Sequence, residues 1–323
     1  MSKKLAFIDL FAGIGGFRIA LEKEGAECVF SSEIDKAAAR AYYENFGDYP
    51  EGDITKISEK DIPKHNILCA GFPCQPFSTA GYRKGFEDAR GTLFFDIARI
   101  LAYHQPEIFI LENVPGLISH DKGKTFDIIK NILIDLGYNI WYDLLNAVDF
   151  GIPQNRNRIF IVGFKKKEQF KKFHFQLPKV KLKKLDEIID FSFYADYLKP
   201  TEKAIENLLF NLNRKGISIS EFANKDFLIA SEIRPSRASI KVNPRVFPTL
   251  PAKMGTGGNN VPVIVKKEYI RKISVREGLN LMGFPKEFFL KENYMQSYKQ
   301  IGNSVVVPVV HCLFKQIKKC IGS

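Results

Sequence analysis

The first half of the chain alternates short apolar runs with amphipathic runs of helical spacing. The apolar runs predict strands at residues 5–9, 27–31, 66–70, 108–111 and 158–163, and a further strand candidate closes at Asp53-Ile54. The segments between them predict helices at residues 17–24, 37–42, 93–103 and 126–136. Strands that alternate with helices are typical of a doubly wound, mostly parallel α/β sheet.

This alternation stops after Gly163, where the amino-acid composition of the chain changes. Nine of the twenty residues from 165 to 184 are lysine, with phenylalanines between them. Residues 180–270 lack the strand–helix order and contain a glycine-rich run, which favours an irregular second module. A helical pattern returns behind Ser274, a residue type that caps helix N-termini. We therefore expect a first domain at 1–178, a smaller domain at 179–272, and a segment at 273–323 that returns to the first domain.

The composition indicates a folded, basic protein. The 323 residues are 45% hydrophobic, enough for a sizeable core and, at roughly 100–200 residues per domain, for two domains. The 48 lysines and arginines exceed the 36 acidic residues, and the net charge of +12 favours a nucleic-acid partner. The five cysteines and five histidines show no metal-binding or disulfide spacing, and no apolar run approaches the roughly 18 residues of a membrane span. We expect a cytoplasmic protein without a metal or a membrane segment.

Cys74 is the candidate nucleophile. It lies in Gly-Phe-Pro-Cys-Gln-Pro-Phe-Ser at residues 71–78, directly after a predicted buried strand. The carboxyl ends of strands are where open α/β sheets bind ligands. Pro73 and Pro76 fix their own φ and restrict the residues before them, which favours an exposed thiol. The alternative is a small buried cysteine in a turn, since free cysteine often packs as a core residue.

A glycine turn follows the first predicted strand, but it lacks the full dinucleotide fingerprint. Glu33, at the end of the second strand, can accept two hydrogen bonds from a ribose diol, and Asp53 can bind an adenine amino group. Phe11 and Ile14 offer apolar walls. Because no Walker lysine follows the glycines, a nucleoside without a triphosphate fits better than ATP. A tight strand–helix connection without a ligand is the alternative.

Several blocks, in the same order along the chain, resemble those of the cytosine-C5 DNA methyltransferases, which use S-adenosylmethionine. Residues 9–17 are similar to the cofactor loop and residues 71–78 to the nucleophile loop. The other similar blocks are Glu-Asn-Val at 112–114, Gln-x-Arg-x-Arg at 154–158, a supporting helix at 276–285 and a block at 300–305 that completes the cofactor pocket. Residues 165–272 correspond to the family's variable target-recognition region. Some members have Trp beside the ribose-binding Glu, where this chain has Ile34.

The resemblance implies methyl transfer from S-adenosylmethionine to C5 of a flipped-out cytosine in duplex DNA, with S-adenosylhomocysteine as product. Cys74 would add to C6, Glu112 would act at N3, and Arg158 would hold the base carbonyl. Arg156 would contact phosphate or brace the loop. The implied cofactor-binding residues are Asp9, Phe11, Ala12, Gly13, Ile14, Gly15, Gly16, Glu33, Ile34, Asp53, Ile54, Pro73, Asn303 and Ser304.

The candidate DNA contacts lie in two regions, one after the nucleophile and one in the second domain. They are Ser78, Thr79, Arg83, Arg90, Arg234, Arg237, Arg245, Gly257, Gly258 and Asn259. Each arginine of the second domain also fits a solvated surface charge.

The resemblance assigns catalysis and cofactor binding to 1–178 and target recognition to 179–272. It implies a monomer that modifies double-stranded DNA, either beside a separate restriction endonuclease or as a solitary enzyme. Two alternatives stay open: an RNA cytosine methyltransferase of the related fold and a catalytically silent nucleic-acid-binding protein.

Overall fold

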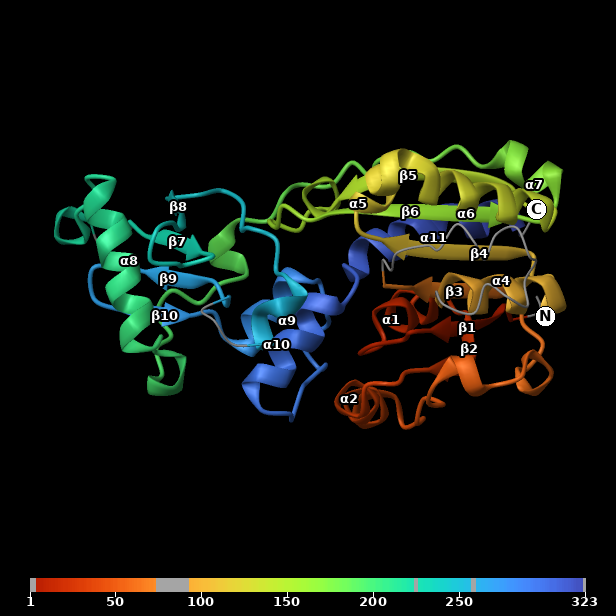
Figure 1. Cartoon of the computed structure of the whole chain (residues 1–323), viewed down its shortest axis with the longest axis horizontal. Coiled ribbons are helices and arrows are strands. Elements are labelled where there is room, and N and C mark those ends of the chain that lie inside the picture. Colours follow the sequence, from red (N-terminus) through yellow and green to blue (C-terminus); the bar gives the residue numbers. More distant parts are fainter. Residues whose placement is uncertain (1–3, 74–92, 224–225, 257–259, 322–323) are drawn as a thin grey trace. The chain divides into compact units, whose positions relative to one another are not determined.

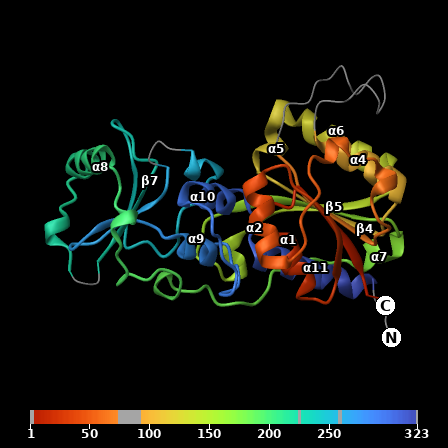
Figure 2. The ribbon, with the colours of Figure 1, turned by 90° about the horizontal axis from the view of Figure 1, so that it is seen from below.

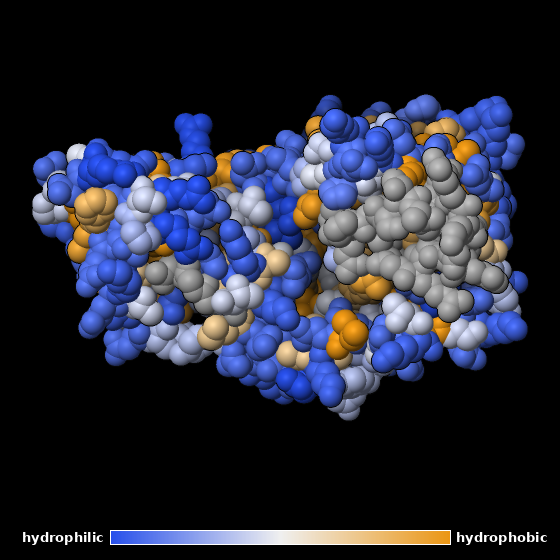
Figure 3. Space-filling view, viewed as in Figure 1, coloured by the Kyte–Doolittle hydropathy of each residue, from blue (hydrophilic) through white to orange (hydrophobic). Residues whose placement is uncertain are grey.

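The computed structural model describes residues 4–73, 93–223, 226–256 and 260–321 (Figure 1). The chain forms two compact units. The first consists of Met1–Asn146, Asn157–Lys179 and Val307–Ser323, and the second of Ala147–Arg156 and Val180–Val306. On the face drawn in Figure 3, hydrophilic residues predominate and hydrophobic ones are scattered among them.

A six-stranded sheet in the order β2-β1-β3-β4-β6-β5 forms the centre of the first unit. Its strands are β1 (Ala6–Leu10), β2 (Glu27–Ser32), β3 (Ile67–Gly71), β4 (Ile108–Asn113), β5 (Asn139–Asn146) and β6 (Asn157–Phe164). The first four are parallel to one another, whereas β6 runs antiparallel to both β4 and β5. The predicted mostly parallel α/β sheet is confirmed.

Helices cover both faces of this sheet (Figure 2). Helices α4 and α6 pack with the strands in one apolar core, while α1 and α11 contact each other on the opposite face. The described α-helices of this unit are α1 (Gly16–Glu22), α2 (Lys36–Phe46), α4 (Leu93–His104), α5 (Gly116–Ser119), α6 (Lys124–Asp135), α7 (Lys167–Lys172) and α11 (Val307–Ile321). The described part of this unit also contains three short 3-10 helices, η1 (Ile54–Lys56), η2 (Glu59–Asp61) and η3 (His120–Gly123).

Two strand assignments from the sequence need correction. The strand candidate closing at Asp53 is wrong, because Asp53 caps the 3-10 helix η1 by accepting a hydrogen bond from the Thr55 amide. Only a single bridge, between Ser32 and Glu51, joins this stretch to β2. Strand β5 was not predicted. It lies at the edge of the sheet and is largely half-buried or exposed, so its sequence lacks a continuous apolar run.

The second unit contains a four-stranded antiparallel sheet in the order β10-β9-β7-β8. Its strands are β7 (Leu228–Ser231), β8 (Ser239–Val242), β9 (Val263–Val265) and β10 (Ile270–Lys272). The remaining helices are α8 (Glu202–Arg214), α9 (Val275–Leu281), α10 (Tyr294–Asn303), η4 (Ala147–Phe150), η5 (Leu185–Glu187), η6 (Asp196–Leu198), η7 (Ile219–Glu221) and η8 (Ala252–Gly255).

Apolar packing and helix capping explain this architecture. Leu208 and Leu212 of α8 pack on the inner face of the small sheet, whose strands are too short to stand out in the sequence. Ser274 caps α9, as predicted, and Glu277 completes a capping box with it. The smaller module therefore lacks the strand–helix alternation, as expected, but contains regular elements.

The described helices include none with both the length and the apolar content needed to cross a membrane. Nor do the described residues gather three or more His, Cys, Asp or Glu side chains that could hold a metal ion.

Gly15 lies at the N-terminus of α1, where two constraints favour glycine. Its φ is +83°, and a Cβ there would lie 2.3 Å from a ring carbon of Phe46. Gly25 has a similar φ, +81°, with nothing within 4 Å of its Cβ position. We predict that Gly15→Ala lowers the free energy of unfolding by about 1–3 kcal/mol more than Gly25→Ala, because only the first adds overpacking to backbone strain. Urea unfolding of the two variants measures this difference, and equal losses would contradict it.

Candidate active site

The candidate site lies at the carboxyl edge of the parallel strands in the first unit. Strand β1 leads into the glycine turn, and β2 ends just before Glu33. Strand β3 leads into Phe72 and Pro73, and β4 contains Glu112 near its end. Since parallel strands end at the same edge of a sheet, residues from four separate parts of the sequence meet there.

Glu33 holds the glycine turn in place. Its Oε2 accepts a hydrogen bond of 2.8 Å from the Gly13 amide, and its Oε1 accepts one of 2.7 Å from the Asp35 amide. Burial raises the pKa of Glu33, while these two amide donors oppose the shift. Each carboxylate oxygen retains lone-pair capacity for another donor, so Glu33 can still accept from a ligand hydroxyl.

A pocket opens beside Glu33. The residues that line it are Phe11, Ser32, Glu33, Ile34, Gly52, Asp53, Ile54 and Leu93. Phe11, Ile34 and Ile54 provide apolar surface, and 68% of Ile34 is exposed. A hydrogen bond from the Thr55 hydroxyl lowers the pKa of Asp53, which keeps this carboxyl ionised as an acceptor.

Only some of the predicted cofactor-binding residues line this pocket. Sequence reasoning missed Ser32, Gly52 and Leu93, which carry no distinctive chemistry. Four residues of the glycine turn are buried and do not line the pocket: Ala12, Ile14, Gly15 and Gly16. Ile14 is 1% exposed, so it packs in the core and does not form the expected wall.

Asp9 is a buried acid beneath the turn. Its side chain is fully buried, and both carboxyl oxygens lack a hydrogen-bond partner among the described residues. Burial raises the pKa of Asp9 well above its usual range, although the positive charge of Arg18 opposes the shift. Because an unpaired buried carboxylate is costly, the folded protein favours the neutral acid.

Glu112 and Arg158 form an ion pair on neighbouring strands. Phe160 of β6 lies opposite Glu112 in the register, and Arg158, two residues earlier, projects from the same face. The Nε atom of Arg158 lies 3.0 Å from Oε1 of Glu112, with side-chain exposures of 16% and 11%. Burial lowers the pKa of Arg158, while the charge of Glu112 opposes this shift. The structure thus brings these two predicted residues together.

Asn113 anchors the backbone that leads toward Cys74. Its side-chain amide donates a buried hydrogen bond of 2.9 Å to the carbonyl oxygen of Phe72. The Phe72 ring is itself buried and packs against Phe94. Pro73 follows and is exposed. The predicted residues Cys74, Ser78, Thr79, Arg83 and Arg90 lie outside the described residues, as do Gly257, Gly258 and Asn259.

Arg156 belongs to the second unit, although only two positions separate it from Arg158. Its guanidinium is buried and donates to the carbonyl oxygens of Leu250, Gly302 and Ser304 at 2.7–2.9 Å. Of the two roles considered for Arg156, these contacts favour bracing over phosphate binding. Asn303, next to these acceptors, is exposed.

The three candidate DNA-contacting arginines of the second unit differ in their surroundings. Arg234 is half-buried and donates to Asn260 at 2.7 Å, so its guanidinium is positioned by a neighbour. Arg237 and Arg245 are exposed.

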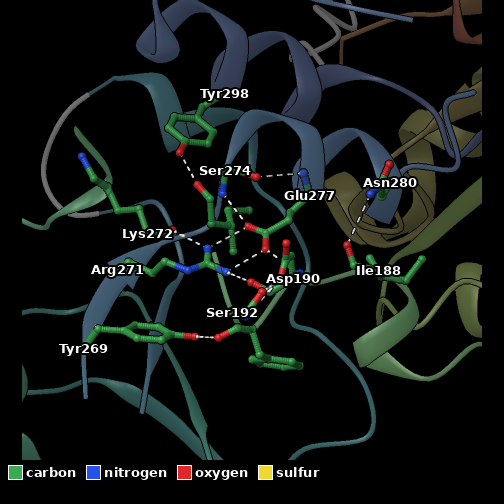
Figure 4. Close-up of polar contacts among 12 residues, drawn as sticks. Ile188, Asp190, Ser192, Tyr269, Arg271, Lys272, Ser274, Glu277, Asn280 and Tyr298 are labelled. Carbon is green, nitrogen blue, oxygen red and sulfur yellow. Dashed lines mark hydrogen bonds and ion pairs between the residues drawn. The ribbon is translucent and has the colours of Figure 1, made fainter. Parts of the chain in front are cut away.

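A buried polar network, absent from the sequence predictions, connects three segments of the second unit (Figure 4). Arg271 is fully buried, and its two terminal nitrogens bind the two oxygens of Glu277 at 2.8 and 2.7 Å. Arg271 also donates to the Asp190 carbonyl, and Glu277 accepts from the Ser274 and Asp190 amides. The network therefore fastens β10 and the segment around Asp190 to the start of α9.

The raised pKa of Asp9 predicts a specific pH dependence of stability. Between the ordinary pKa of an aspartate and the raised value, the folded chain binds more protons than the unfolded chain. The free energy of unfolding then falls as pH rises through that window. We expect Asp9→Asn, which cannot ionise, to gain stability relative to the wild type as pH increases from about 4. Urea unfolding at several pH values tests this, and exposed Asp135→Asn serves as the control. Parallel curves for wild type and Asp9→Asn would contradict the expectation.

Removing one partner of the Arg271–Glu277 pair leaves a buried charge. We predict that Glu277→Gln lowers the free energy of unfolding by about 3–5 kcal/mol, measured in urea. Glu206→Gln is a matched control, because Glu206 pairs with Lys203 on the exposed surface of the same unit. That control should change stability little. Similar losses in both variants would show that burial of the pair does not determine its contribution.

Comparisons with known proteins show what this chain is similar to. The model of the family "C-5 cytosine-specific DNA methylase" matches residues 5–319. Among similar proteins, the Type II methyltransferase M.SsoII of Shigella sonnei is 44% identical over 96% of this chain and 79% of its own length. M.HpaII of Haemophilus parainfluenzae is 42% identical over 100% and 92%, and M.HhaI of Haemophilus parahaemolyticus is 42% identical over 95% and 92%.

Solved structures show the same fold at lower identity. The Entamoeba histolytica methyltransferase EhMeth has a TM-score of 0.73 at 20% identity, covering 99% of each chain. The S. pombe Dnmt2 methyltransferase has a TM-score of 0.72 at 21% identity, covering 99% of this chain and 100% of its own. The match of the family model over nearly the whole chain, with relatives at 42–44% identity, shows that this chain belongs to the C-5 cytosine-specific DNA methylases and is a DNA cytosine-5-methyltransferase, as its sequence blocks predicted.

Proposed function

We propose that the enzyme transfers a methyl group from S-adenosylmethionine to C5 of a flipped-out cytosine in a specific short sequence of duplex DNA. The observation that carries this proposal is the shared sheet edge, which combines the pocket beside Glu33, the Glu112–Arg158 pair and the anchored backbone before Cys74. The similar proteins named as Type II methyltransferases support a role as the modification enzyme of a restriction–modification system. A separate restriction endonuclease would then cut the same sequence when it is unmethylated.

The residues of the pocket fit the adenosine part of S-adenosylmethionine. Ile34, Ile54 and Phe11 would contact the adenine, Glu33 would accept from the ribose hydroxyls, and Asp53 would accept from the adenine amino group. Among the described residues, the lining contains two carboxylates and no lysine or arginine, which disfavours a phosphorylated nucleotide. When bound, S-adenosylmethionine supplies an electrophilic methyl group.

Cys74 is the proposed nucleophile, and Glu112 and Arg158 position the base. Carbon 5 of cytosine is weakly nucleophilic, so a thiolate must first add to C6. This addition forms an S–C6 bond and moves electrons toward N3 and C5, while Glu112 donates a proton or hydrogen bond at N3. Arg158 holds Glu112 through Nε, and its planar donor fork suits the base carbonyl. After C5 has accepted the methyl group, loss of the C5 proton breaks the S–C6 bond.

The positions at which these side chains must act imply that the target base is flipped out of the duplex. Neither C6 nor N3 of a stacked, paired cytosine is accessible to a side chain, so the base must leave the duplex. We infer that the module predicted at 179–272 reads the sequence, with Arg237 and Arg245 among its exposed cations. Residues 1–178 would then contain catalysis and cofactor binding, residues 273–323 would support them, and one chain would suffice for activity.

Bisulfite sequencing of mixed-sequence duplex DNA after incubation with the protein and S-adenosylmethionine tests the proposal. We expect protected cytosines at one short motif. Cys74→Ser should abolish protection while S-adenosylmethionine binding, measured by calorimetry, is retained. Glu112→Gln should lower the methylation rate about 10²- to 10⁴-fold, the usual contribution of a general acid.

Glu107→Gln is the matched control, because Glu107 lies in the same unit and pairs with Lys166 at the surface. It should methylate at the wild-type rate. Full bisulfite conversion with wild-type protein that binds S-adenosylmethionine would contradict duplex DNA as substrate, and methylation by Cys74→Ser would contradict its role as nucleophile.

A further inference from the structure

A second pocket, of about 620 Å³, lies in the second unit. Its lining is rich in cations, whereas carboxylates line the pocket beside Glu33. The residues that line this second pocket include Lys183, Lys184, Phe191, Phe227, Arg245 and Lys266. Four segments that are far apart in the sequence contribute to it, including the end of the lysine-rich run that the methyl-transfer site does not use.

Two aromatic side chains form an apolar surface in this pocket. The ring centroids of Phe191 and Phe227 are 4.5 Å apart, and both residues are half-buried. Their backbones are fixed: the Tyr269 hydroxyl donates to the Phe191 carbonyl, and Asn243 exchanges hydrogen bonds with the backbone of Phe227. A positioned aromatic pair of this kind is a suitable stacking surface for a nucleobase.

Four cations accompany this aromatic pair. Among the described residues, Lys183, Lys184, Arg245 and Lys266 line the pocket together with one acid, Asp186. None of the four cations forms an ion pair with a carboxylate among the residues that the structure describes. Clustered cations repel one another, and an anion bound between them would relieve this repulsion. A phosphate group has the charge and the acceptor oxygens for such a site.

We propose that this pocket binds a nucleoside phosphate, with the base against Phe191 and Phe227 and the phosphate among the lysines and Arg245. The ligand is either a nucleotide of a bound DNA strand or a free nucleotide, because both present the same chemistry. The pocket beside Glu33, where the described residues supply two carboxylates and no cation, suits an uncharged nucleoside part instead. The proposal concerns the second unit alone and does not depend on methyl transfer.

Calorimetry with thymidine 5′-monophosphate tests the site directly, because a pyrimidine nucleotide avoids the pocket proposed for adenosine. Saturating S-adenosylhomocysteine is included to occupy that pocket. We expect one nucleotide bound per chain, at least about tenfold more tightly than thymidine or inorganic phosphate alone, since each lacks half of the contacts. Absence of saturable binding at millimolar nucleotide would overturn the proposal.

Matched variants distinguish a pocket from general surface charge. Lys184→Gln with Lys266→Gln should weaken nucleotide binding about tenfold or more. Lys241→Gln with Lys267→Gln removes the same charge from exposed positions of the same unit that do not line the pocket, and should leave the affinity unchanged. Phe227→Leu should weaken binding several-fold by removing the stacking surface while it keeps apolar volume. Equal effects of the two lysine pairs would overturn the proposal.

Competition identifies the source of the ligand. If thymidine 5′-monophosphate displaces a labelled short duplex, and Lys184→Gln with Lys266→Gln weakens duplex binding more than the control pair does, the occupant is a nucleotide of the DNA strand. If the nucleotide binds without affecting duplex binding, the occupant is a free nucleotide. Urea unfolding of every variant establishes that the second unit remains folded, and methylation is measured separately.

Discussion

The candidate site depends on the parallel register of β3 and β4, which pairs Gly71 with Glu112. The two positions are close neighbours, since a Cβ at Gly71 would lie 3.5 Å from Oε2 of Glu112, an ordinary van der Waals distance. One residue further along each strand, Asn113 binds the Phe72 carbonyl. The register therefore sets the distance between the acid on one strand and the loop that follows the other, before any side chain of that loop is considered.

The charge of each pocket matches the ligand proposed for it and not the net charge of the chain. The protein is basic overall, yet the turn edge of the first unit gathers Asp9, Glu33 and Asp53, and no cation lines its pocket in the part of the chain that the structure describes. The second unit contains a pocket with four cations and one acid. A net charge of +12 therefore indicates a polyanionic partner for the surface, but gives no information about the pocket proposed for the cofactor, where hydrogen-bond acceptors would be needed.

Local sequence patterns were sufficient to predict some elements of the structure and insufficient to predict others. The buried strand β3 and the Ser274 cap were predictable, because an apolar run and a capping residue act over a few positions. The edge strand β5 was not, since its exposed positions resemble a loop. The partner of Glu277 could not be inferred from spacing alone, because Arg271 reaches it from another element, and neighbouring Arg156 and Arg158 lie in different units.

Two arginine–glutamate pairs differ in burial, and this difference distinguishes a structural pair from a candidate substrate-binding pair. Arg271 binds Glu277 through two nitrogens, is fully buried and also binds backbone carbonyls, so substrate has no access to it. Arg158 meets Glu112 through Nε, and both side chains keep some exposure at the sheet edge. Breaking the first pair would leave a charge in the protein interior, whereas the second can exchange part of its contact for a ligand. The same residue types therefore form a structural ion pair in one unit and a candidate substrate-binding pair in the other.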